Sequence, residues 1–375
     1  MTLSHQLSEI RIMAAKEKYA EPTYLECGFG ELEQKVISPE ICCRCGTCEA
    51  LCPRIEHKEN RPELVDYDPL CGLCYAYCPR TFLDMGEIEA KIFGRSRSQD
   101  EALGIFKKVV AAQAASKTGS AQDGGVATAL LVHALQNGMI DCAIVTDRDE
   151  EWRTTAIVAT TPEEIIKAAG TKYAITNSVF ALKEALEKGF QKIGFVGTPC
   201  QIQAMRKVQL LEEPYQLGQE RIALLVGLFC MENFDYDSLM NGLVRGSFGL
   251  EPKDIARFEI KKGMFRAVDK KGEAHEVKIE ETDKYTFPGC GPCFDFASEL
   301  ADISVGSVGS PDGWSTVLLR TGAGEKLYAA ALAAGAVQEK AVSEKGLDLV
   351  KRLAGNKAER FAKCSKEMNV VGIKR

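Results

Sequence analysis

The cysteines between residues 42 and 78 have the spacing of thiolates that bind iron–sulfur clusters. The first run is Cys42-x2-Cys45-x2-Cys48-x3-Cys52-Pro; the second is Cys71-x2-Cys74-x3-Cys78-Pro, with Asp68 where a first cysteine is missing. In this arrangement three closely spaced thiolates bind one cluster, and the fourth, next to proline, binds the other. The spacing therefore predicts one [4Fe–4S] cluster on Cys42, Cys45, Cys48 and Cys78, and a second on Cys71, Cys74, Cys52 and Asp68.

Zinc and disulfide bonds are the alternative uses of these thiols. Structural zinc usually takes four ligands in two pairs, whereas seven thiols stand here in cluster spacing. Asp68 is the weak position, because a carboxylate is a harder and weaker ligand than a thiolate in such a site. We therefore expect the second cluster to be the more labile one, with its fourth ligand left open. Cys43 is interpreted as a loop residue, and Cys27 is assigned no role.

Four further cysteines form a second group in the later part of the chain. Cys200 and Cys230 each follow a predicted strand, and Cys290 and Cys293 form a Cys-Gly-Pro-Cys pair. Such a pair with two dispersed thiols can make one four-thiolate site, for a third cluster or for zinc. Cys-Gly-Pro-Cys is also a motif of redox dithiols. The spacing alone leaves these three interpretations open.

Length and composition limit the kind of protein that carries these thiols. The chain has 375 residues, of which 45% are hydrophobic and 27% charged, as in an ordinary globular protein of two or three domains. Its net charge of −6 gives no overall attraction to nucleic acid or anionic lipid. Fifteen cysteines favour a reducing compartment, so we expect a cytoplasmic location. No signal peptide or membrane-spanning run is recognisable, so a membrane link would require a partner.

The pattern around these motifs predicts an α/β protein with a small two-cluster module in front of a larger domain. We expect an N-terminal arm (1–35), the module (36–90), a polar linker (91–100), the large domain (101–340) and a basic helical tail (341–375). Helices are predicted over 101–116, 126–137, 162–169, 178–188, 201–211, 324–333 and 344–355. Strands are predicted at 140–146, 192–196, 222–229, 301–305 and 316–319, with an antiparallel meander over 255–280. Cys142 is then a core residue.

Two glycine-rich segments could approach a ligand closely. Gln122-Asp123-Gly124-Gly125 comes just before a predicted helix, whose N-terminus could receive a phosphate. This segment is neither the dinucleotide fingerprint nor the Walker P-loop. Gly306-Ser307-Val308-Gly309 follows a predicted strand and fits a plain loop and a cofactor cradle equally well. Lys172 and Tyr173 offer a cation and a ring to an anionic or aromatic ligand, or simply belong to the surface.

Together, the motifs of the large domain resemble the beta subunit of coenzyme F420-reducing hydrogenase. The resemblance runs from about 105 to 335 and includes 122–125, 170–173, 197–201, 229–230, 290–296 and 299–306. In that family the domain holds FAD and one [4Fe–4S] cluster and exchanges hydride with the deazaflavin coenzyme F420. The resemblance implies that Cys200, Cys230, Cys290 and Cys293 bind the cluster. It implies a flavin pocket drawn from Gln122, Asp123, Gly124, Gly125, Thr128, Lys172, Tyr173, Thr198, Pro199, Gln201, Gly306, Val308 and Gly309.

The two-cluster module in front is similar to that of two relatives, the beta subunit of F420-dependent formate dehydrogenase and the input subunit of membrane F420H2 dehydrogenase. F420 exchanges hydride and clusters carry single electrons, so a flavin has to lie between them. We therefore expect FAD, three [4Fe–4S] clusters and F420 as substrate. The expected partner is the catalytic subunit of formate dehydrogenase, within or outside a larger heterodisulfide reductase-type assembly.

Three alternatives remain open at this point, one of them a flavin enzyme that shares the motifs of the large domain and acts on another pyrrole or disulfide substrate. The chain could be the input subunit of F420 hydrogenase or of F420H2 dehydrogenase, with the same chemistry and another electron destination. It could also be a non-catalytic iron–sulfur electron-transfer or docking subunit, without a substrate site of its own. Because F420 carries a phosphate and a polyglutamate tail, a local basic patch is expected, for which Arg148, Arg153 and Lys172 are candidates.

Overall fold

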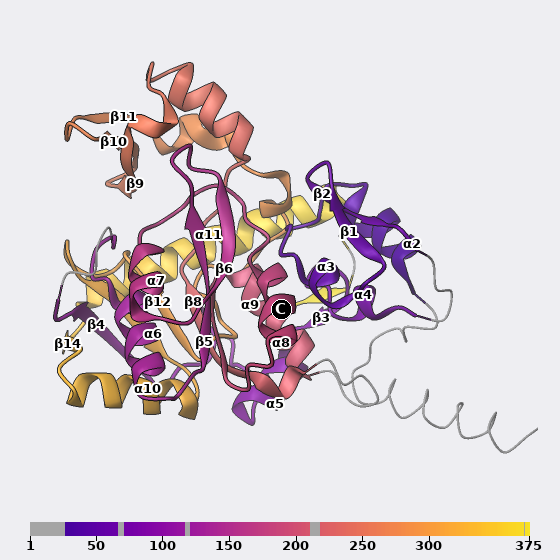
Figure 1. Ribbon diagram of the computed structural model, residues 1–375, viewed down its shortest axis with the longest axis horizontal. Coiled ribbons are helices and arrows are strands. Elements are labelled where there is room, and N and C mark those ends of the chain that lie inside the picture. Colours follow the sequence, from indigo (N-terminus) through magenta and orange to yellow (C-terminus); the bar gives the residue numbers. More distant parts are fainter. Residues whose placement is uncertain (1–26, 67–70, 117–120, 211–217, 371) are drawn as a thin grey trace, which may run out of the picture.

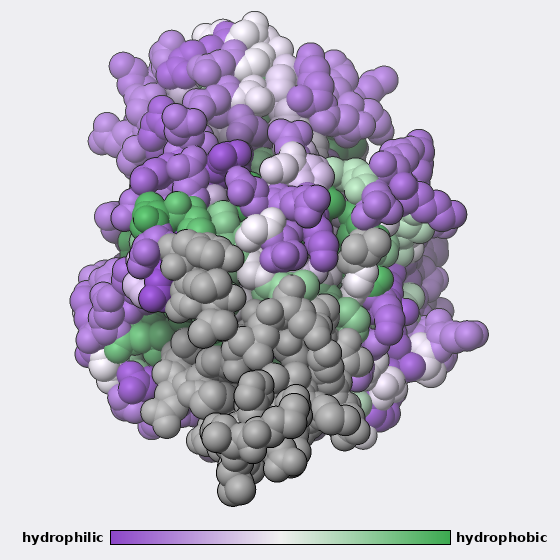
Figure 2. Space-filling view, turned by 90° about the vertical axis from the view of Figure 1, so that its right-hand side faces the viewer, coloured by the Kyte–Doolittle hydropathy of each residue, from purple (hydrophilic) through white to green (hydrophobic). Residues whose placement is uncertain are grey.

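A large sheet, a cysteine-rich module and a small meander make up the computed structural model, which describes residues 27–66, 71–116, 121–210, 218–370 and 372–375 (Figure 1). The mixed α/β class predicted from the sequence is confirmed. In Figure 1 the module lies at the right, and the meander lies above the sheet. Figure 2 shows the right-hand face, which is mostly hydrophilic with apolar patches between. Within the described ranges, no helix has the length and apolar character needed to cross a bilayer.

The main sheet brings the ends of five parallel strands to one edge. Its order is β14-β4-β13-β12-β8-β7-β5-β6. The strands are β4 (Lys108–Ala114), β5 (Cys142–Arg148), β6 (Thr154–Ala159), β7 (Ile193–Gly197), β8 (Ile222–Leu228), β12 (Ile303–Gly306), β13 (Ser315–Leu319) and β14 (Val337–Lys340). Strands β12, β8, β7 and β5 pair in parallel, and β13 is antiparallel to both β12 and β4, so β4 shares their direction. Ligands of open α/β sheets bind at the carboxyl edge of such strands.

Alternation along the strands divides the core between the two faces of the sheet. Val145 and Val226 point to the face covered by α6 (Val126–Gln136), α7 (Pro162–Lys167) and α10 (Gly322–Ala333). Ile144 and Leu225, their neighbours in sequence, point to the face covered by α8 (Ala181–Glu187) and α9 (Pro199–Leu210). This is the period of two expected of strands buried on both sides. Cys142 is fully buried in this core, as predicted.

The cysteine-rich module packs directly on the second of these faces. Its elements are α2 (Phe29–Leu32), the π-helical turn η1 (Glu33–Ile37), α3 (Thr47–Leu51), β1 (Ile55–Lys58), β2 (Arg61–Leu64), α4 (Leu73–Ala76), β3 (Leu83–Asp84) and α5 (Met85–Phe93). Val36, Ile41 and Tyr77 belong to the same apolar cluster as Leu182 and Ile202 of α8 and α9. The module and the large domain therefore share one core.

The meander and the C-terminal segment complete the fold. Strands β9 (Ile255–Lys261), β10 (Met264–Asp269) and β11 (Ala274–Lys278) form the predicted antiparallel meander. It packs on the π-helix η4 (Ser238–Arg245) around Phe258 and Phe265. Helix α11 (Glu344–Glu367) crosses behind the sheet toward the module, where β15 (Ile373–Lys374) pairs with β3 (Figure 1). Short 3-10 turns complete the loops: η2 (Ser178–Phe180), η3 (Gln219–Arg221), η5 (Pro252–Asp254), η6 (Ile279–Tyr285) and η7 (Pro288–Cys290).

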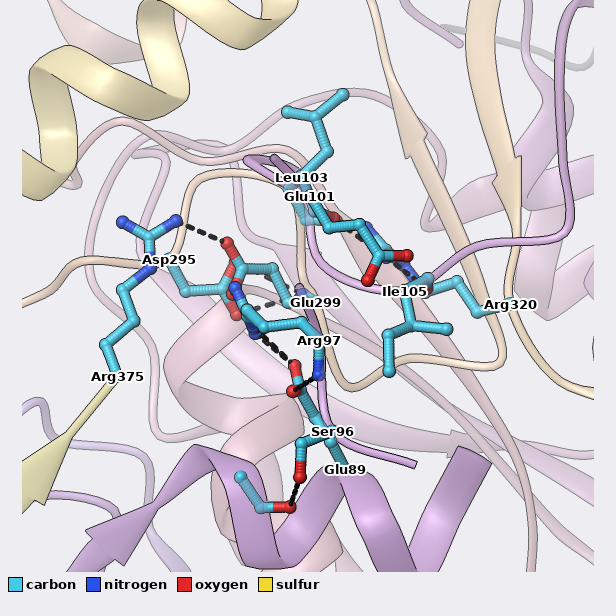
Figure 3. A network of polar contacts seen from close by, with 12 residues as sticks. Glu89, Ser96, Arg97, Glu101, Leu103, Ile105, Asp295, Glu299, Arg320 and Arg375 are labelled. Carbon is cyan, nitrogen blue, oxygen red and sulfur yellow. Dashed lines mark hydrogen bonds and ion pairs between the residues drawn. The ribbon is translucent and has the colours of Figure 1, made fainter. Parts of the chain in front are cut away.

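The polar stretch between module and large domain is anchored by buried ion pairs (Figure 3). Arg97 donates through Nε to Glu89 at 2.7 Å and forms an ion pair with Glu299 at 2.6 Å, and both carboxylates are fully buried. Arg375 reaches the same Glu299 at 3.1 Å. Arg320, also fully buried, donates to three backbone carbonyls and to a serine hydroxyl nearby. This network joins α5, the large domain and the C-terminal segment.

Two predicted helices need correction, and two strands were missed. The helix expected over 101–116 is wrong, because 108–114 is strand β4, paired on both sides by β13 and β14. A short buried apolar run does not distinguish helix from strand by its periodicity. Strands β6 and β14 at the two edges of the sheet were not predicted, since their burial patterns lack clean alternation. The tail helix is longer than the expected 344–355 and extends to Glu367.

Candidate functional site

The carboxyl edge of the sheet gathers four cysteines from distant parts of the chain. Cys200 follows β7 at the start of α9, and Cys230 follows β8. Cys290 is the last residue of η7, and Cys293 lies on the loop after it. Each of Cys230 and Cys290 has the other thiols of this set among its electrostatic neighbours. Burial raises the pKa of Cys290 to about 12, although the N–H of Asn233 donates to its sulfur at 3.3 Å. The pair opens no helix, unlike a thioredoxin-type dithiol.

The front module forms two further sets of thiols. Cys42, Cys45, Cys48 and Cys78 are mutual electrostatic neighbours, as predicted for the first cluster. Cys52, Cys71 and Cys74 form the second set. Asp68, the predicted fourth ligand of that set, lies outside the described residues. Gly46, in the first loop, has a φ of +88°, and a Cβ there would lie 2.8 Å from the carbonyl oxygen of Asn177. Glycine thus lets this loop meet the large domain.

The spacing of the sulfurs fits clusters better than zinc. None of the fifteen cysteines is in a disulfide. In the described part of the chain, only Asp269, Glu273 and His275 place three potential ligand atoms within 4.8 Å of one another. Tetrahedral zinc, with Zn–S bonds of about 2.3 Å, holds its sulfurs about 3.8 Å apart. A cubane takes each thiolate on a different iron and so needs a wider spacing, and no three thiols of the described residues come within 4.8 Å of one another.

The first and third thiol sets are in contact with each other. Cys43 is buried and hydrogen-bonds with Cys45 on one side and with Cys200 on the other. A Cβ on Gly289 would lie 2.1 Å from the carbonyl oxygen of Cys42, so the two loops touch through their backbones. The interpretation of Cys43 as a mere loop residue is therefore incomplete. Cys27, to which no role was assigned, is buried and hydrogen-bonds with Tyr75.

Replacing Cys43 by alanine should leave the iron content of the purified chain unchanged, because both neighbouring sets are complete without this thiol. Cys45→Ala, the matched control, should lose about four irons per chain. Iron is measured by colorimetric assay after anaerobic reconstitution. A loss of iron from Cys43→Ala would instead make Cys43 a ligand.

The predicted phosphate-binding segment lies at the carboxyl end of β4. A Cβ on Gly124 would lie 2.7 Å from the carbonyl oxygen of Ala112 and from Oγ of Ser315, so only glycine fits. Tyr173 hydrogen-bonds with Gln122, and Asp123 pairs with Lys261 at 3.7 Å. Thr128 is half-buried in the first turn of α6. The structure thus brings Gln122 and Tyr173 together beside the N-terminus of α6.

Other predicted flavin residues support the neighbouring loops. The N–H of Thr198 donates to Gln201 at 2.9 Å, and the Gln201 amide donates to the carbonyl of Thr176 at 2.8 Å. Pro199 is the first residue of α9, and the Thr198 hydroxyl lies 3.3 Å from the Cys200 sulfur. These residues hold Cys200 at the end of β7.

The second glycine-rich loop, from Gly306 to Gly309, packs against other segments of the chain at the carboxyl edge of the sheet. A Cβ on Gly306 would collide with the Phe229 ring, and the carbonyl oxygen of Gly309 approaches Gly346 of α11. The carbonyl of Val308 accepts the hydroxyl of Thr316 at 2.7 Å. Close packing therefore explains why Gly306 and Gly309 are glycines, and no ligand is needed for that explanation.

The three candidate cations for an acidic ligand have different surroundings. The ammonium of Lys172 donates to the carbonyls of Ala168 and Ala169, just after α7. Arg148 stacks on Trp152 at 3.7 Å, and Arg153 lies over Tyr236 at 4.5 Å. Of the three, only Arg153 lines the polar crevice between the module and the large domain.

Lys172 should make the stability of the fold depend on pH. Burial lowers the pKa of Lys172 from 10.5 to about 8. Between these values the unfolded chain binds the proton that the folded chain has lost, so the free energy of unfolding should rise with pH from about 8 to 10.5. Urea denaturation across this range should show the rise in the wild type and a smaller one in Lys172→Met. An equal rise of the free energy of unfolding with pH in the wild type and in Lys172→Met would contradict this role of Lys172.

Buried cations around the thiols were missed by the sequence analysis. Lys357 of α11 donates to the carbonyl of Cys230 at 2.5 Å, and Lys207 of α9 donates to the carbonyl of Cys78 at 3.0 Å. Arg80, next to the Cys78-Pro79 dipeptide, is buried between the first and third sets. Of these three cations, only Arg80 could have been found from the sequence, because it directly follows the predicted ligand motif Cys78-Pro79. Lys207 and Lys357 are brought in by helices that the tertiary fold positions.

Fold and site together define an α/β protein that carries a four-thiol set at the carboxyl edge of its main sheet, beside a module with two further thiol sets. Two family models match the large domain. Residues 109–183 match the N-terminal part of the coenzyme F420 hydrogenase/dehydrogenase beta subunit, and residues 190–345 match its C-terminal part. Neither family model covers the front module, because the two matches begin at residues 109 and 190.

Individual relatives point to the same family. The beta subunit of the coenzyme F420 hydrogenase of Methanosarcina barkeri is 42% identical over 281 residues, covering 73% of this chain and 96% of that protein. A subunit of the F420H2 dehydrogenase of Methanosarcina mazei is 34% identical over 343 residues, covering 89% of this chain and 95% of that protein. A chain in the F420-reducing [NiFe] hydrogenase complex of M. barkeri superimposes with a TM-score of 0.69 at 42% identity, over 72% of this chain and 95% of that chain.

The chain belongs to the family of coenzyme F420 hydrogenase/dehydrogenase beta subunits, and it is an oxidoreductase subunit of that kind. Membership implies FAD and iron–sulfur cofactors. The match to the M. mazei dehydrogenase protein leaves only about a tenth of this chain uncovered, so it has to include much of the first 90 residues. The front module is therefore shared with that relative.

Proposed function

We propose that the chain exchanges hydride with coenzyme F420 at an FAD held by the large domain, and relays single electrons through three [4Fe–4S] clusters to a partner. The observation that carries this proposal is the contact between thiol sets. Cys48 of the first set neighbours Cys74 of the second, and Cys43 joins the first set to Cys200 of the third. The sets therefore stand in series, from the module surface to the sheet edge.

The residues of the chain would divide the work as follows. When bound, the flavin converts between two-electron hydride chemistry and the one-electron chemistry of the clusters. Cys200, Cys230, Cys290 and Cys293 would bind the third cluster, and Thr198 with Gln201 would fix Cys200. Gln122 to Gly125 with Thr128, Lys172 with Tyr173, and the loop of Gly306, Val308 and Gly309 remain the proposed flavin-binding residues.

The two front sets keep the ligands proposed from the sequence. Cys42, Cys45, Cys48 and Cys78 would bind the first cluster, and Cys52, Cys71 and Cys74 the second, with Asp68 as the proposed fourth ligand. Arg153, beside the polar crevice, is the best placed of the three candidate cations for the acidic tail of F420. Thiols that have to stay reduced agree with the proposed cytoplasmic location.

The comparisons favour an F420 hydrogenase or F420H2 dehydrogenase partner over formate dehydrogenase. The named relatives above are a hydrogenase beta subunit and a subunit of F420H2 dehydrogenase. Of these two, the dehydrogenase relative matches the larger share of this chain, front module included, which supports a dehydrogenase-type input subunit. The formate dehydrogenase partner expected from the sequence has less support. The non-catalytic alternative is weakened because the matches span the whole large domain.

The test is an anaerobic assay of the purified chain with reduced viologen as electron donor, in which the absorbance of F420 is followed. We expect F420 reduction by a chain that holds one FAD and about twelve irons. A chain loaded with FAD and iron that does not turn F420 over would refute the hydride exchange and leave the electron-transfer alternative. A chain that holds its iron but no flavin would also refute the hydride exchange and leave the electron-transfer alternative.

A further inference from the structure

Arg80 is a buried cation located between the first and third thiol sets. Its side chain is almost completely buried, with 3% of the residue exposed. Nη2 donates to the carbonyl of Gly289, on the loop that carries Cys290, at 3.3 Å. The guanidinium also lies near Cys42 and Cys78 of the first set and near Cys200 and Cys293 of the third. A single side chain from the front module therefore reaches the ligand loop of the large domain.

Two donors of this guanidinium have no oxygen or nitrogen acceptor. Nε and Nη1 of Arg80 are both buried and without such a partner. Its strongest electrostatic neighbours are thiols rather than a carboxylate. A buried cation is costly unless it is paired and hydrogen-bonded. Negatively charged clusters on the adjoining cysteines would supply both the opposite charge and sulfur acceptors for these two donors.

We propose that Arg80 is a positioning residue that raises the reduction potentials of the first and third clusters together. The inference rests on the proposed binding of clusters by these thiols. A fixed positive charge and hydrogen bonds to sulfur both favour the reduced, more negative state of a cluster. Because Arg80 faces both sets, it would shift the two potentials in the same direction relative to that of the second cluster.

Lys357 provides a matched control in the same structure. It is also a fully buried cation, with 1% exposure, but its neighbours are Cys230, Cys290, Cys293 and Asp295, all on the side of the third set. Its removal should therefore act on one cluster, whereas removal of Arg80 should act on two. The second set, which neither cation faces, serves as the internal reference.

The experiment is an anaerobic redox titration followed by EPR on the full chain with reconstituted clusters. Wild type, Arg80→Gln, Arg80→Lys and Lys357→Gln are compared after iron determination, and Cys71→Ser identifies the signal of the second cluster. In Arg80→Gln we expect two of the three clusters to become harder to reduce by at least tenfold, which is 59 mV for a one-electron couple. Arg80→Lys should shift little, and Lys357→Gln should shift one cluster only.

Each other outcome contradicts the inference in a distinct way. Unchanged potentials in Arg80→Gln with full iron would show that this charge does not tune the clusters. A shift of a single cluster, or of all three equally, would refute the joint effect on the first and third. If Arg80→Gln loses iron, Arg80→Met provides a second neutral variant. A wild-type chain without cluster signals would refute the proposed function itself, and this inference with it.

Discussion

Replacing Cys230 by serine should remove about four irons from each reconstituted chain and stop F420H2 from reducing the two front clusters. Cys230 sits among Cys200, Cys290 and Cys293 at the carboxyl edge of the sheet. Each thiolate of such a site holds a separate iron. The thiols that act most strongly on Cys230 are those of its own set, whereas Cys43 lies beside Cys200 and could replace it as a ligand. Replacing Cys230 is therefore a clearer test of the electron path than replacing Cys200.

The measurements are iron content and the EPR signals of the front clusters after F420H2 is added anaerobically. Cys142→Ser is the matched control, because Cys142 is a buried cysteine of β5 without another thiol among its neighbours. It should keep its iron and its electron transfer. If Cys230→Ser kept full iron and normal front-cluster reduction, the third site would have to lie elsewhere.

Replacing Arg97 by alanine should destabilise the fold by about 3–5 kcal/mol, the range for removing one partner of a buried ion pair. Arg97 compensates Glu89 and Glu299, and both carboxylates are fully buried. Without it, Glu89 would lose its ion-pair partner, and Glu299 would keep its ion pair with Arg375 and the charge of the nearby Arg320. Since Glu89 belongs to α5 and Glu299 to the large domain, the loss should also loosen the module from the sheet (Figure 3).

Anaerobic urea denaturation measures this effect as a lower midpoint. Arg95→Ala is the control, because Arg95 pairs with Glu101 at the surface, where such pairs contribute little. A midpoint for Arg97→Ala equal to that of Arg95→Ala would show that the buried network does not hold the two parts together. Limited proteolysis between α5 and β4 gives an independent measurement, with faster cleavage expected in Arg97→Ala alone.

The sequence by itself predicted which residues could carry the chemistry. Ligand spacing is a local property, so Cys42, Cys45 and Cys48 could be grouped without a fold. Turn-bounded strands and the meander were equally local, and β7, β8 and β9 to β11 lie where the apolar pattern places them. The combined motifs of the large domain were specific enough to indicate the family that the comparisons show.

Only the tertiary structure decided how these parts meet. Strand β4 looked helical because a buried apolar run has no diagnostic period, and its identity depends on pairing with β13 and β14. Cys43 lies near Cys200, and Arg80 near Cys293, because the module docks on α8 and α9 across more than a hundred residues of sequence. Contacts between distant segments leave no periodic or spacing signal. The order of the thiol sets and their buried cations therefore became visible only in the folded chain.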